Sequence, residues 1–185
     1  MDWDNFSCPI CNSDDYVPIG GNPSSSVMLI GAYPGDEEIR KGVPMVGATG
    51  GVLKTELHKL GLDLNMFRLA NLWFHPEPKV NAGKDREAQK FIEAQKQKCL
   101  SFFAEQLIKE AKGKKAILLM GAKTVDYFCN KKVSAVCGLQ VTSPYLSVPI
   151  IYACVNPADV FHSSIGEMRL ALTKFAKRLE IEEIS

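Results

Sequence analysis

Four short apolar runs, each bounded by turn residues, are the clearest pattern along the chain. Runs of this length between turn signals are typical of strands that are buried on both faces of a sheet. The segments between them carry apolar residues at helical spacing, for example Leu53, Leu57 and Leu60 ahead of a terminating Gly61. The predicted strands are residues 27–31, 68–73, 116–121 and 148–155. The predicted helices are residues 49–60, 85–112, 121 to about 129, and 167–179.

The alternation of strands and helices predicts an α/β fold with a parallel sheet, because parallel neighbours need crossover helices that cover both faces. The chain has 185 residues, the size of one ordinary domain, and it contains no internal repeat. Residues 1–25 are rich in Pro, Gly, Asn and Ser. They are therefore predicted to form a loop-rich N-terminal segment of a single domain that spans residues 1–185.

Composition narrows the function only slightly. Hydrophobic residues make up 46% of the chain, which is enough for a well-packed core. The net charge of +1 gives no bulk attraction to nucleic acid or to a membrane surface. No stretch is apolar enough to span a bilayer, and the first residues lack a signal-peptide pattern. We therefore expect a cytoplasmic protein whose six cysteines are reduced or bound to metal.

Polar turn residues follow the predicted strands, and in a parallel sheet such turns meet at the carboxyl edge, where ligands collect. Two turns carry the asparagines Asn71 and Asn156, and a third, residues 31–35, lets the backbone approach a ligand closely. An asparagine amide pairs a donor with an acceptor, which suits the edge of a planar, polar, uncharged ligand. The alternative is that both asparagines only cap turns. The glycine–lysine pattern of a phosphate-binding loop is absent from the sequence.

The sequence CPIC near the N-terminus places Cys8 and Cys11 at the spacing of half a metal site. A complete site needs two further ligands. Cys129 and Cys137 form a competing pair of thiols. Cys154 lies in a predicted strand and is expected in the core.

Three segments, LIGAYPGDEEIRKGVPMVGATGGVL, RLANLWFHPEP and VNPADVF, follow one another in the chain. Together they resemble the family-4 uracil-DNA glycosylases in motif order and spacing over roughly residues 8–165. The first motif is the specific one. The resemblance implies an α/β/α sandwich around a four-stranded parallel sheet, with a pocket for a flipped base at the strand ends.

The resemblance also gives roles to single residues. Asn71 is expected to hydrogen-bond the pyrimidine edge, Met45 to lie on the base face, and Asn156 to stand where the family polarises the base O2. Val160 and Phe161 are expected to fill the gap left by the extruded nucleotide. On this basis the expected catalytic residues are Asn71 and Asn156. The residues expected to contact base or DNA are Gly31, Ala32, Tyr33, Pro34, Gly35, Met45, Asn71, Asn156, Val160, Phe161 and His162.

The chain departs from the family pattern at four places. Ala32 stands where the family has Glu, Met45 replaces a stacking Phe, and His75 replaces a Cys. Asn156 begins an Asn-Pro-Ala segment in place of His-Pro-Ser, a start that resembles the mismatch-specific uracil glycosylases of the same superfamily. Because a carboxylate and a polarising side chain are both missing, we expect slower cleavage than is usual for the family.

The resemblance further implies the remaining metal ligands. His75 and Cys99 stand at the positions that complete a [4Fe–4S] cluster with Cys8 and Cys11 in the family. The expected cofactor is therefore a [4Fe–4S] cluster. The alternative is structural zinc, because three thiolates and an imidazole equally suit a tetrahedral zinc ion. The alternative for Cys99 is a buried core position on its helix. The metal is expected to attach the N-terminal segment to the domain.

These observations favour a DNA glycosylase that excises uracil or a modified pyrimidine from a flipped nucleotide. Met45 in place of Phe leaves room for a substituent at the 5-position of the base. A second hypothesis is a catalytically weak or inactive module of the same fold that binds DNA or a base, and Ala32 favours it. A third is a nucleotide-handling α/β enzyme unrelated to DNA, which the near-neutral charge favours. The expected partner is duplex or single-stranded DNA, with no membrane contact, and the expected state is a monomer.

Overall fold

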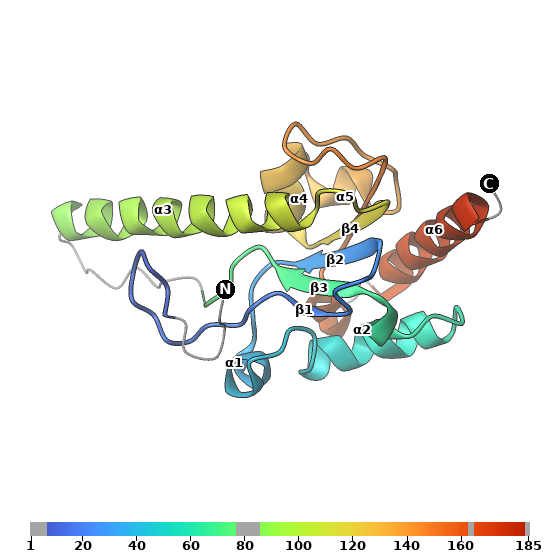
Figure 1. Ribbon diagram of the computed structural model, residues 1–185, viewed down its shortest axis with the longest axis horizontal. Helices are drawn as coiled ribbons and strands as arrows, with labels where there is room; N and C mark the ends of the chain where they lie inside the picture. Colours follow the sequence, from blue (N-terminus) through green and yellow to red (C-terminus); the bar gives the residue numbers. More distant parts are fainter. Residues whose placement is uncertain (1–6, 77–85, 163–164, 184–185) are drawn as a thin grey trace.

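The computed structural model describes residues 7–76, 86–162 and 165–183, and its centre is a five-stranded sheet of order β1-β3-β2-β4-β5 (Figure 1). Strands β2 to β5 pair in parallel, and β1 pairs antiparallel with β3. The predicted four-stranded parallel sheet is thus confirmed, with one antiparallel edge strand added to it. The strands are β1 Gly20–Gly21, β2 Val27–Gly31, β3 Arg68–Asn71, β4 Ala116–Met120 and β5 Ile150–Cys154.

Helices cover both faces of the sheet, as the alternating pattern predicts (Figure 1). The α-helices are α1 Asp36–Lys41, α2 Ala48–His58, α3 Arg86–Glu110, α4 Ala122–Cys129, α5 Val133–Val136 and α6 Ile165–Glu183. Two 3-10 helices, η1 Leu64–Met66 and η2 Pro157–His162, complete the set.

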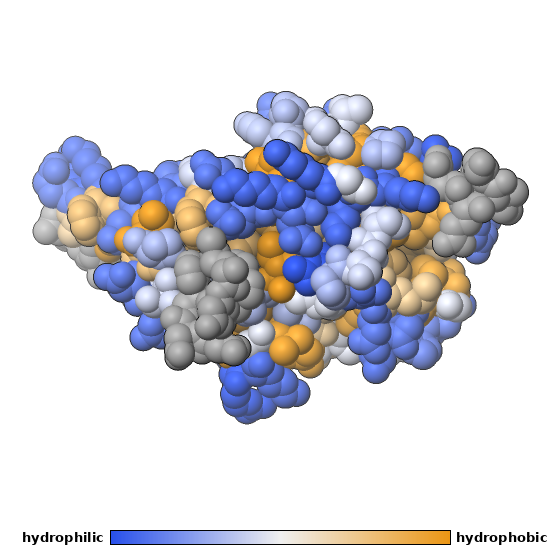
Figure 2. Space-filling view, viewed as in Figure 1, coloured by the Kyte–Doolittle hydropathy of each residue, from blue (hydrophilic) through white to orange (hydrophobic). Residues whose placement is uncertain are grey.

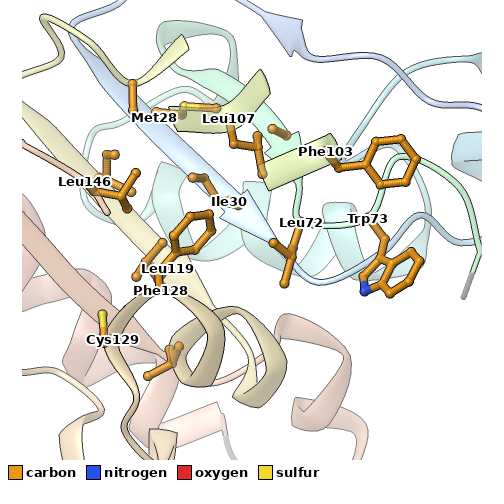
Figure 3. Close-up of a cluster of buried hydrophobic side chains, with 14 of the residues drawn as sticks. Met28, Ile30, Leu72, Trp73, Phe103, Leu107, Leu119, Phe128, Cys129 and Leu146 are labelled. Carbon is orange, nitrogen blue, oxygen red and sulfur yellow. The ribbon is translucent and has the colours of Figure 1, made fainter. Parts of the chain in front are cut away.

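Two hydrophobic cores result, one on each side of the sheet, because successive side chains of a strand point to opposite faces. In β2, Ile30 belongs to the core under α3 and α4, where it shares a cluster with Phe103 and Phe128 (Figure 3). Leu29 of the same strand belongs to the other core, which α2 and α6 supply with Leu57 and Phe175, among others. The three-layer α/β/α sandwich is therefore confirmed.

Three short elements were not predicted from the pattern of apolar residues. Strand β1 consists of two glycines, and a Cβ atom at Gly21 would lie 2.3 Å from the carbonyl oxygen of Phe67, so its backbone fits against β3 only without a side chain. Helix α1 is built from the charge block after the first strand, and α5 has a single turn. All three are too short, at two, six and four residues, to show a periodic apolar pattern.

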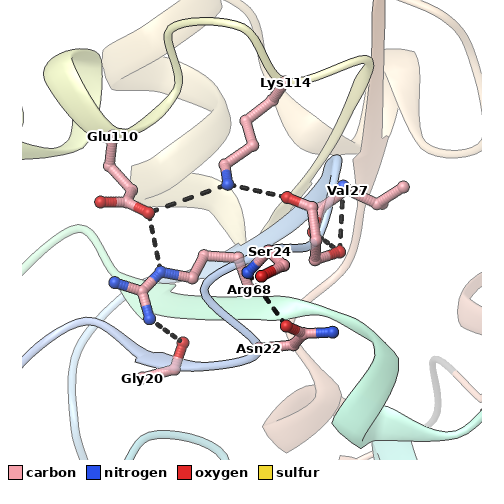
Figure 4. Close-up of polar contacts among 8 residues, drawn as sticks. Gly20, Asn22, Ser24, Val27, Arg68, Glu110 and Lys114 are labelled. Carbon is pink, nitrogen blue, oxygen red and sulfur yellow. Dashed lines mark hydrogen bonds and ion pairs between the residues drawn. The ribbon is translucent and has the colours of Figure 1, made fainter.

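Two half-buried cations, Arg68 and Lys114, make polar contacts near the amino-terminal ends of β2 and β3 (Figure 4). Arg68 donates to the carboxylate of Glu110 at 2.7 Å and to the carbonyl oxygen of Gly20 at 3.1 Å. Lys114 donates to the carbonyl oxygen of Ser25 at 2.7 Å. These contacts tie the loop before β2 to the end of α3.

Hydrophilic residues cover most of the face seen in Figure 2, including α1 at its lower edge, with separate apolar patches between them. Among the described residues, no helix combines the length and the apolar character that crossing a bilayer requires.

Candidate functional site

A cavity of about 370 Å³ lies at the carboxyl edge of the sheet, where β2, β3 and β4 end. Its wall is formed by residues 31–38, 47–50 and 156–158 together with Met45, Asn71 and Met120. The structure thus brings together, in one cavity, residues from all three sequence motifs. The carboxyl edge is where ligands bind in open parallel sheets.

Glu38 joins the two irregular turns of the first motif. Its Oε2 accepts a hydrogen bond from the backbone N–H of Gly35 at 2.7 Å, and its Oε1 accepts one from the backbone N–H of Met45. The side chain is buried, and burial raises the pKa of its carboxyl against the lowering effect of these two bonds. The acid in the middle of a charge block is therefore a structural link between two walls of the cavity.

Glycines let these walls approach one another. A Cβ atom at Gly31 would lie 2.5 Å from Oδ1 of Asn71 and 2.9 Å from Cε of Met45. A Cβ atom at Gly50, in the first turn of α2, would lie 2.0 Å from the carbonyl oxygen of Met45. Met45 itself has a φ of 60°, a left-handed conformation that is uncommon for a residue with a side chain. Met45, which the sequence predicts to lie on the base face, is thus held at the cavity wall by close backbone packing.

Asn71 is the last residue of β3 and pairs in register with Gly31. Its side chain is 5% exposed, and its Nδ2 has no hydrogen-bond partner among the residues that the structure describes. A buried donor without a partner costs about 1–3 kcal/mol, so such groups are rare outside functional sites. Asn71 lines the cavity, where a ligand can supply the missing acceptor.

Asn156 lies after β5, close to Gly121 and Ala32: a Cβ atom at Gly121 would be 3.3 Å from Cβ of Asn156 and 3.8 Å from Cβ of Ala32. Oδ1 of Asn156 accepts a hydrogen bond from the backbone N–H of Ala158 at 3.1 Å. The turn-capping role that the sequence left open therefore occupies the oxygen of this amide. Its Nδ2 remains the group that can donate to a ligand.

The expected wedge residues follow directly. The backbone of Val160, Phe161 and His162 lies in η2, next to the cavity residues Pro157 and Ala158. The side chains of these three residues lie outside the part of the chain that the structure describes.

A second group of side chains lies where the N-terminal segment, the exit of β3 and helix α3 meet. It consists of Cys8, Cys11, His75 and Cys99. Each residue offers one ligand atom, and these four atoms all lie within 4.8 Å of one another. The Sγ atoms of Cys8 and Cys99 are 3.7 Å apart, and Sγ of Cys11 is 3.4 Å from Nε2 of His75. These four residues, far apart in sequence, can hold a metal.

The surroundings of this group are apolar. Cys8, His75 and Cys99 are buried, and the rings of Trp73 and Phe103 contact the imidazole edge-on at centroid distances of 5.8 and 5.0 Å. Burial raises the pKa of the Cys99 thiol and lowers the pKa of the His75 imidazole. Neutral His75 with its Nδ1 on the carbonyl oxygen of Pro76 at 2.7 Å leaves Nε2 available as a ligand atom.

The family model described as the uracil DNA glycosylase superfamily matches residues 18–180. The chain belongs to the uracil DNA glycosylase superfamily. A stretch of 61 residues is also 38% identical to a type-4 uracil-DNA glycosylase of Archaeoglobus fulgidus, and it covers 31% of this chain and 31% of that relative. The chain therefore matches about a third of the length of this curated relative. The family resemblance seen in the sequence is confirmed.

The other cysteines do not form the competing pair considered from the sequence. Cys129 is buried in α4, and burial raises the pKa of its thiol. Cys137 instead contacts Cys154, and this hydrogen bond lowers the pKa of the Cys137 thiol to about 7. Neither thiol belongs to the group around His75.

Sequence reasoning missed two residues that shape the walls of the cavity. Thr124 of α4 is buried and donates from Oγ1 to the carbonyl oxygen of Gly31 at 2.9 Å, which fixes the end of β2. Glu38 was hidden among exposed charges. The spacing of three residues from the N-cap Gly35 to Glu38 is the signal that was available, because an acid at the third helical position reaches back to the N-cap backbone.

We expect Glu38→Gln to destabilise the fold by about 1–3 kcal/mol, because the amide has one acceptor oxygen for two buried N–H donors. Urea unfolding of the variant measures this loss. Glu37→Gln is the matched control, because the Glu37 side chain is 43% exposed and its ion pairs with Arg40 and Lys41 lie at the surface. Equal unfolding midpoints for Glu38→Gln and Glu37→Gln would exclude the linking role of Glu38.

Proposed function

We propose that this chain is a DNA glycosylase that binds a flipped pyrimidine in the cavity and cleaves its N-glycosidic bond. The observation that carries the proposal is the buried amide of Asn71, a residue of the cavity wall whose Nδ2 has no partner in the described chain. Membership of the uracil DNA glycosylase superfamily and the likeness to a type-4 uracil-DNA glycosylase support it.

The pyrimidine edge matches what Asn71 offers. An amide presents one acceptor and two donors, so Oδ1 can accept from N3–H of uracil while Nδ2 donates to O4. The cavity volume of about 370 Å³ lies in the range of small-molecule sites, which bind ligands through few polar groups in an apolar wall. Met45 supplies the apolar wall, and as a flexible thioether side chain it tolerates a substituent at the 5-position.

The bond to be cleaved sets the remaining requirements. The sugar becomes oxocarbenium-like in the transition state, and the departing base carries negative charge. Nδ2 of Asn156 is the side-chain donor we assign to that charge, since its Oδ1 already accepts from Ala158. Loss of one such donor typically lowers the rate about 10²–10³-fold.

A binding module of the same fold is the second candidate, and Ala32 favours it. Ala32 lines the cavity and offers no carboxylate to orient water beside the sugar. The two candidates differ in one observable, which is the formation of abasic sites. Incubation with single-stranded and duplex oligonucleotides that carry uracil, hydroxymethyluracil, hypoxanthine or xanthine, followed by strand cleavage at abasic sites, tests this. The proposal requires cleavage at a pyrimidine, whereas tight binding without cleavage at any base supports the module.

Ala32→Glu is expected to raise the single-turnover excision rate by about 10²-fold, the lower end of what a positioned general base contributes. The new carboxylate would stand beside Asn156, given the closeness of Ala32 and Asn156 to Gly121. Ala32→Gln is the matched control, because it has the same size without the charge. Equal rates for the two variants would mean that a carboxylate at this position does not take part.

The segment after β5 is proposed to support the flipped nucleotide. Val160, Phe161 and His162 follow the cavity residues in η2, which is the position of the wedge in the family pattern. Phe161→Ala is expected to weaken binding to a uracil-containing duplex at least about 10-fold more than binding to the single strand, because extrusion costs a few kcal/mol only in the duplex. Titrations with both substrates measure this, and equal losses would assign Phe161 to the fold instead.

The metal group is proposed to be structural. It joins the N-terminal turn of Cys8 and Cys11 to the exit of β3 and to α3. Backbone bonds prepare this turn, with Asn12 donating to the carbonyl oxygen of Cys8 at 2.8 Å and Cys8 donating to that of Ser13 at 2.9 Å. The expected cytoplasmic location and monomeric state stay predictions from the sequence.

A further inference from the structure

The metal group is more compact than the iron–sulfur cluster expected from the family resemblance. With a Zn–S bond of about 2.3 Å and a Zn–N bond of about 2.1 Å, two thiolates on one tetrahedral ion lie about 3.8 Å apart, and a thiolate and an imidazole about 3.6 Å apart. The observed separations are 3.7 Å between the Sγ atoms of Cys8 and Cys99, and 3.4 Å between Cys11 and His75.

A cube of four irons needs a wider cage. Each ligand of a [4Fe–4S] cube binds a different iron. The distance between two ligand atoms is therefore the distance expected on a single ion plus the separation of the two irons, which places the ligand atoms more than about 6 Å apart. All four ligand atoms here lie within 4.8 Å of one another. This spread is smaller than a cube needs and closer to the separation of about 3.8 Å on a single ion, so the donor set favours one ion over a cube.

The residues around the metal group bury it. Cys8 and Cys99 are fully buried and His75 nearly so, and Phe103, itself fully buried, packs against the imidazole. Nδ1 of His75 lies 2.7 Å from the carbonyl oxygen of Pro76. A bond of this kind on the far ring nitrogen is what orients histidines that bind a metal through Nε2.

We propose that Cys8, Cys11, His75 and Cys99 bind a single tetrahedral ion, zinc by the chemistry of three thiolates and one imidazole, in place of an iron–sulfur cluster. Four protein ligands leave no open position on a tetrahedral zinc ion, so such a site stabilises the fold. This inference does not depend on the proposed glycosylase activity, because it concerns the metal alone.

Metal analysis of the full chain, purified without oxygen and without added metal, tests the inference. The expected result is a colourless protein with about one zinc ion per chain and no acid-labile sulfide. Exchange with Co²⁺ is expected to give the strong visible absorption of tetrahedral cobalt and a cobalt–thiolate band. A brown protein with iron and acid-labile sulfide in equal amounts overturns the proposal, as does a folded protein that binds no metal.

Variants identify the ligands. His75→Cys keeps four tetrahedral ligands, so zinc stays bound and the cobalt–thiolate band grows in proportion to a fourth thiolate. Cys11→Ser is expected to lose most of its zinc, whereas Cys137→Ser, outside the group, is expected to keep it. If Cys11→Ser keeps as much zinc as Cys137→Ser, or if His75→Cys leaves the cobalt–thiolate band unchanged, the proposed ligand set is wrong.

Discussion

Replacement of Asn71 by Asp is expected to lower uracil excision by about 10²–10³-fold, the cost of removing one positioned donor from a reacting base. The substitution exchanges an amide, which both donates and accepts, for a carboxylate that only accepts. It also brings a like charge near the departing anion. A cytosine-like edge offers an amino donor to that carboxylate, so activity on such a base is expected to rise relative to activity on uracil. Single-turnover excision from matched single-stranded oligonucleotides measures both effects.

A nonpolar replacement separates this role from a structural one. Nδ2 of Asn71 is buried without a partner in the described chain, so Asn71→Leu removes an unsatisfied donor. We expect the variant to be inactive but at least as stable as the wild type in urea, since the desolvation cost of the donor disappears. Asn65→Leu, at an exposed position in η1, is the control for both readouts. A destabilised Asn71→Leu protein, or one that still excises uracil, would contradict the role given to Asn71.

Removal of the metal is expected to cause the largest loss of stability. The ion would hold the turn of Cys8 and Cys11 on the domain, and the free energy of binding a structural ion is folding free energy, which is lost when the ion is removed. A loss of several kcal/mol corresponds to a fall of about 10 °C or more in the melting temperature of a chain of this size. Melting curves with and without a chelator measure it, and readdition of the metal should restore the original curve.

The same experiment reports on the cavity, because Asn71 lies a few residues before His75 on the exit of β3. Backbone bonds from Leu72 to Gly31 at 2.8 Å and from Trp73 to Ala32 at 2.9 Å connect this exit to β2. We therefore expect metal-free protein to bind uracil-containing DNA more weakly and to be cut by proteases within residues 7–19. A melting temperature that changes by less than about 2 °C on chelation, with unchanged protease resistance, would show that the site does not hold the fold.

The sheet could be predicted from the sequence because its strands are buried on both faces. Residues 27–31 and 116–120 are continuous apolar runs, and a run of five residues between turn signals is too short for a buried helix, which leaves a buried strand. The edge strand β1 could not be predicted in this way. Its two glycines pair with β3 through backbone alone, and a backbone contact leaves no periodic pattern in the side chains.

The site was predictable as far as motif spacing determines it. Asn71 and Met45 line one cavity, and the four proposed metal ligands come together, although long segments separate them in the chain. For Cys99 the sequence left two alternatives, a metal ligand and a buried core position. The structure is consistent with both, since Cys99 is fully buried in the core and also lies in the ligand group. The role of Glu38 could not be inferred from its charge. In the sequence, a buried glutamate that accepts hydrogen bonds from two backbone N–H groups looks the same as a solvent-exposed glutamate.

The central claim is that the cavity binds an extruded base through Asn71, and the side-chain amide of Asn71 reports on it directly. In NMR spectra of ¹⁵N-labelled protein, its two amide signals can be assigned by their absence from Asn71→Asp. Titration with a single-stranded oligonucleotide that carries a non-cleavable 2′-fluoro analogue of deoxyuridine is expected to shift both signals and to slow their exchange with water. An oligonucleotide without uracil should leave them in place. Saturated binding of the uracil analogue with unchanged Asn71 signals would contradict the account.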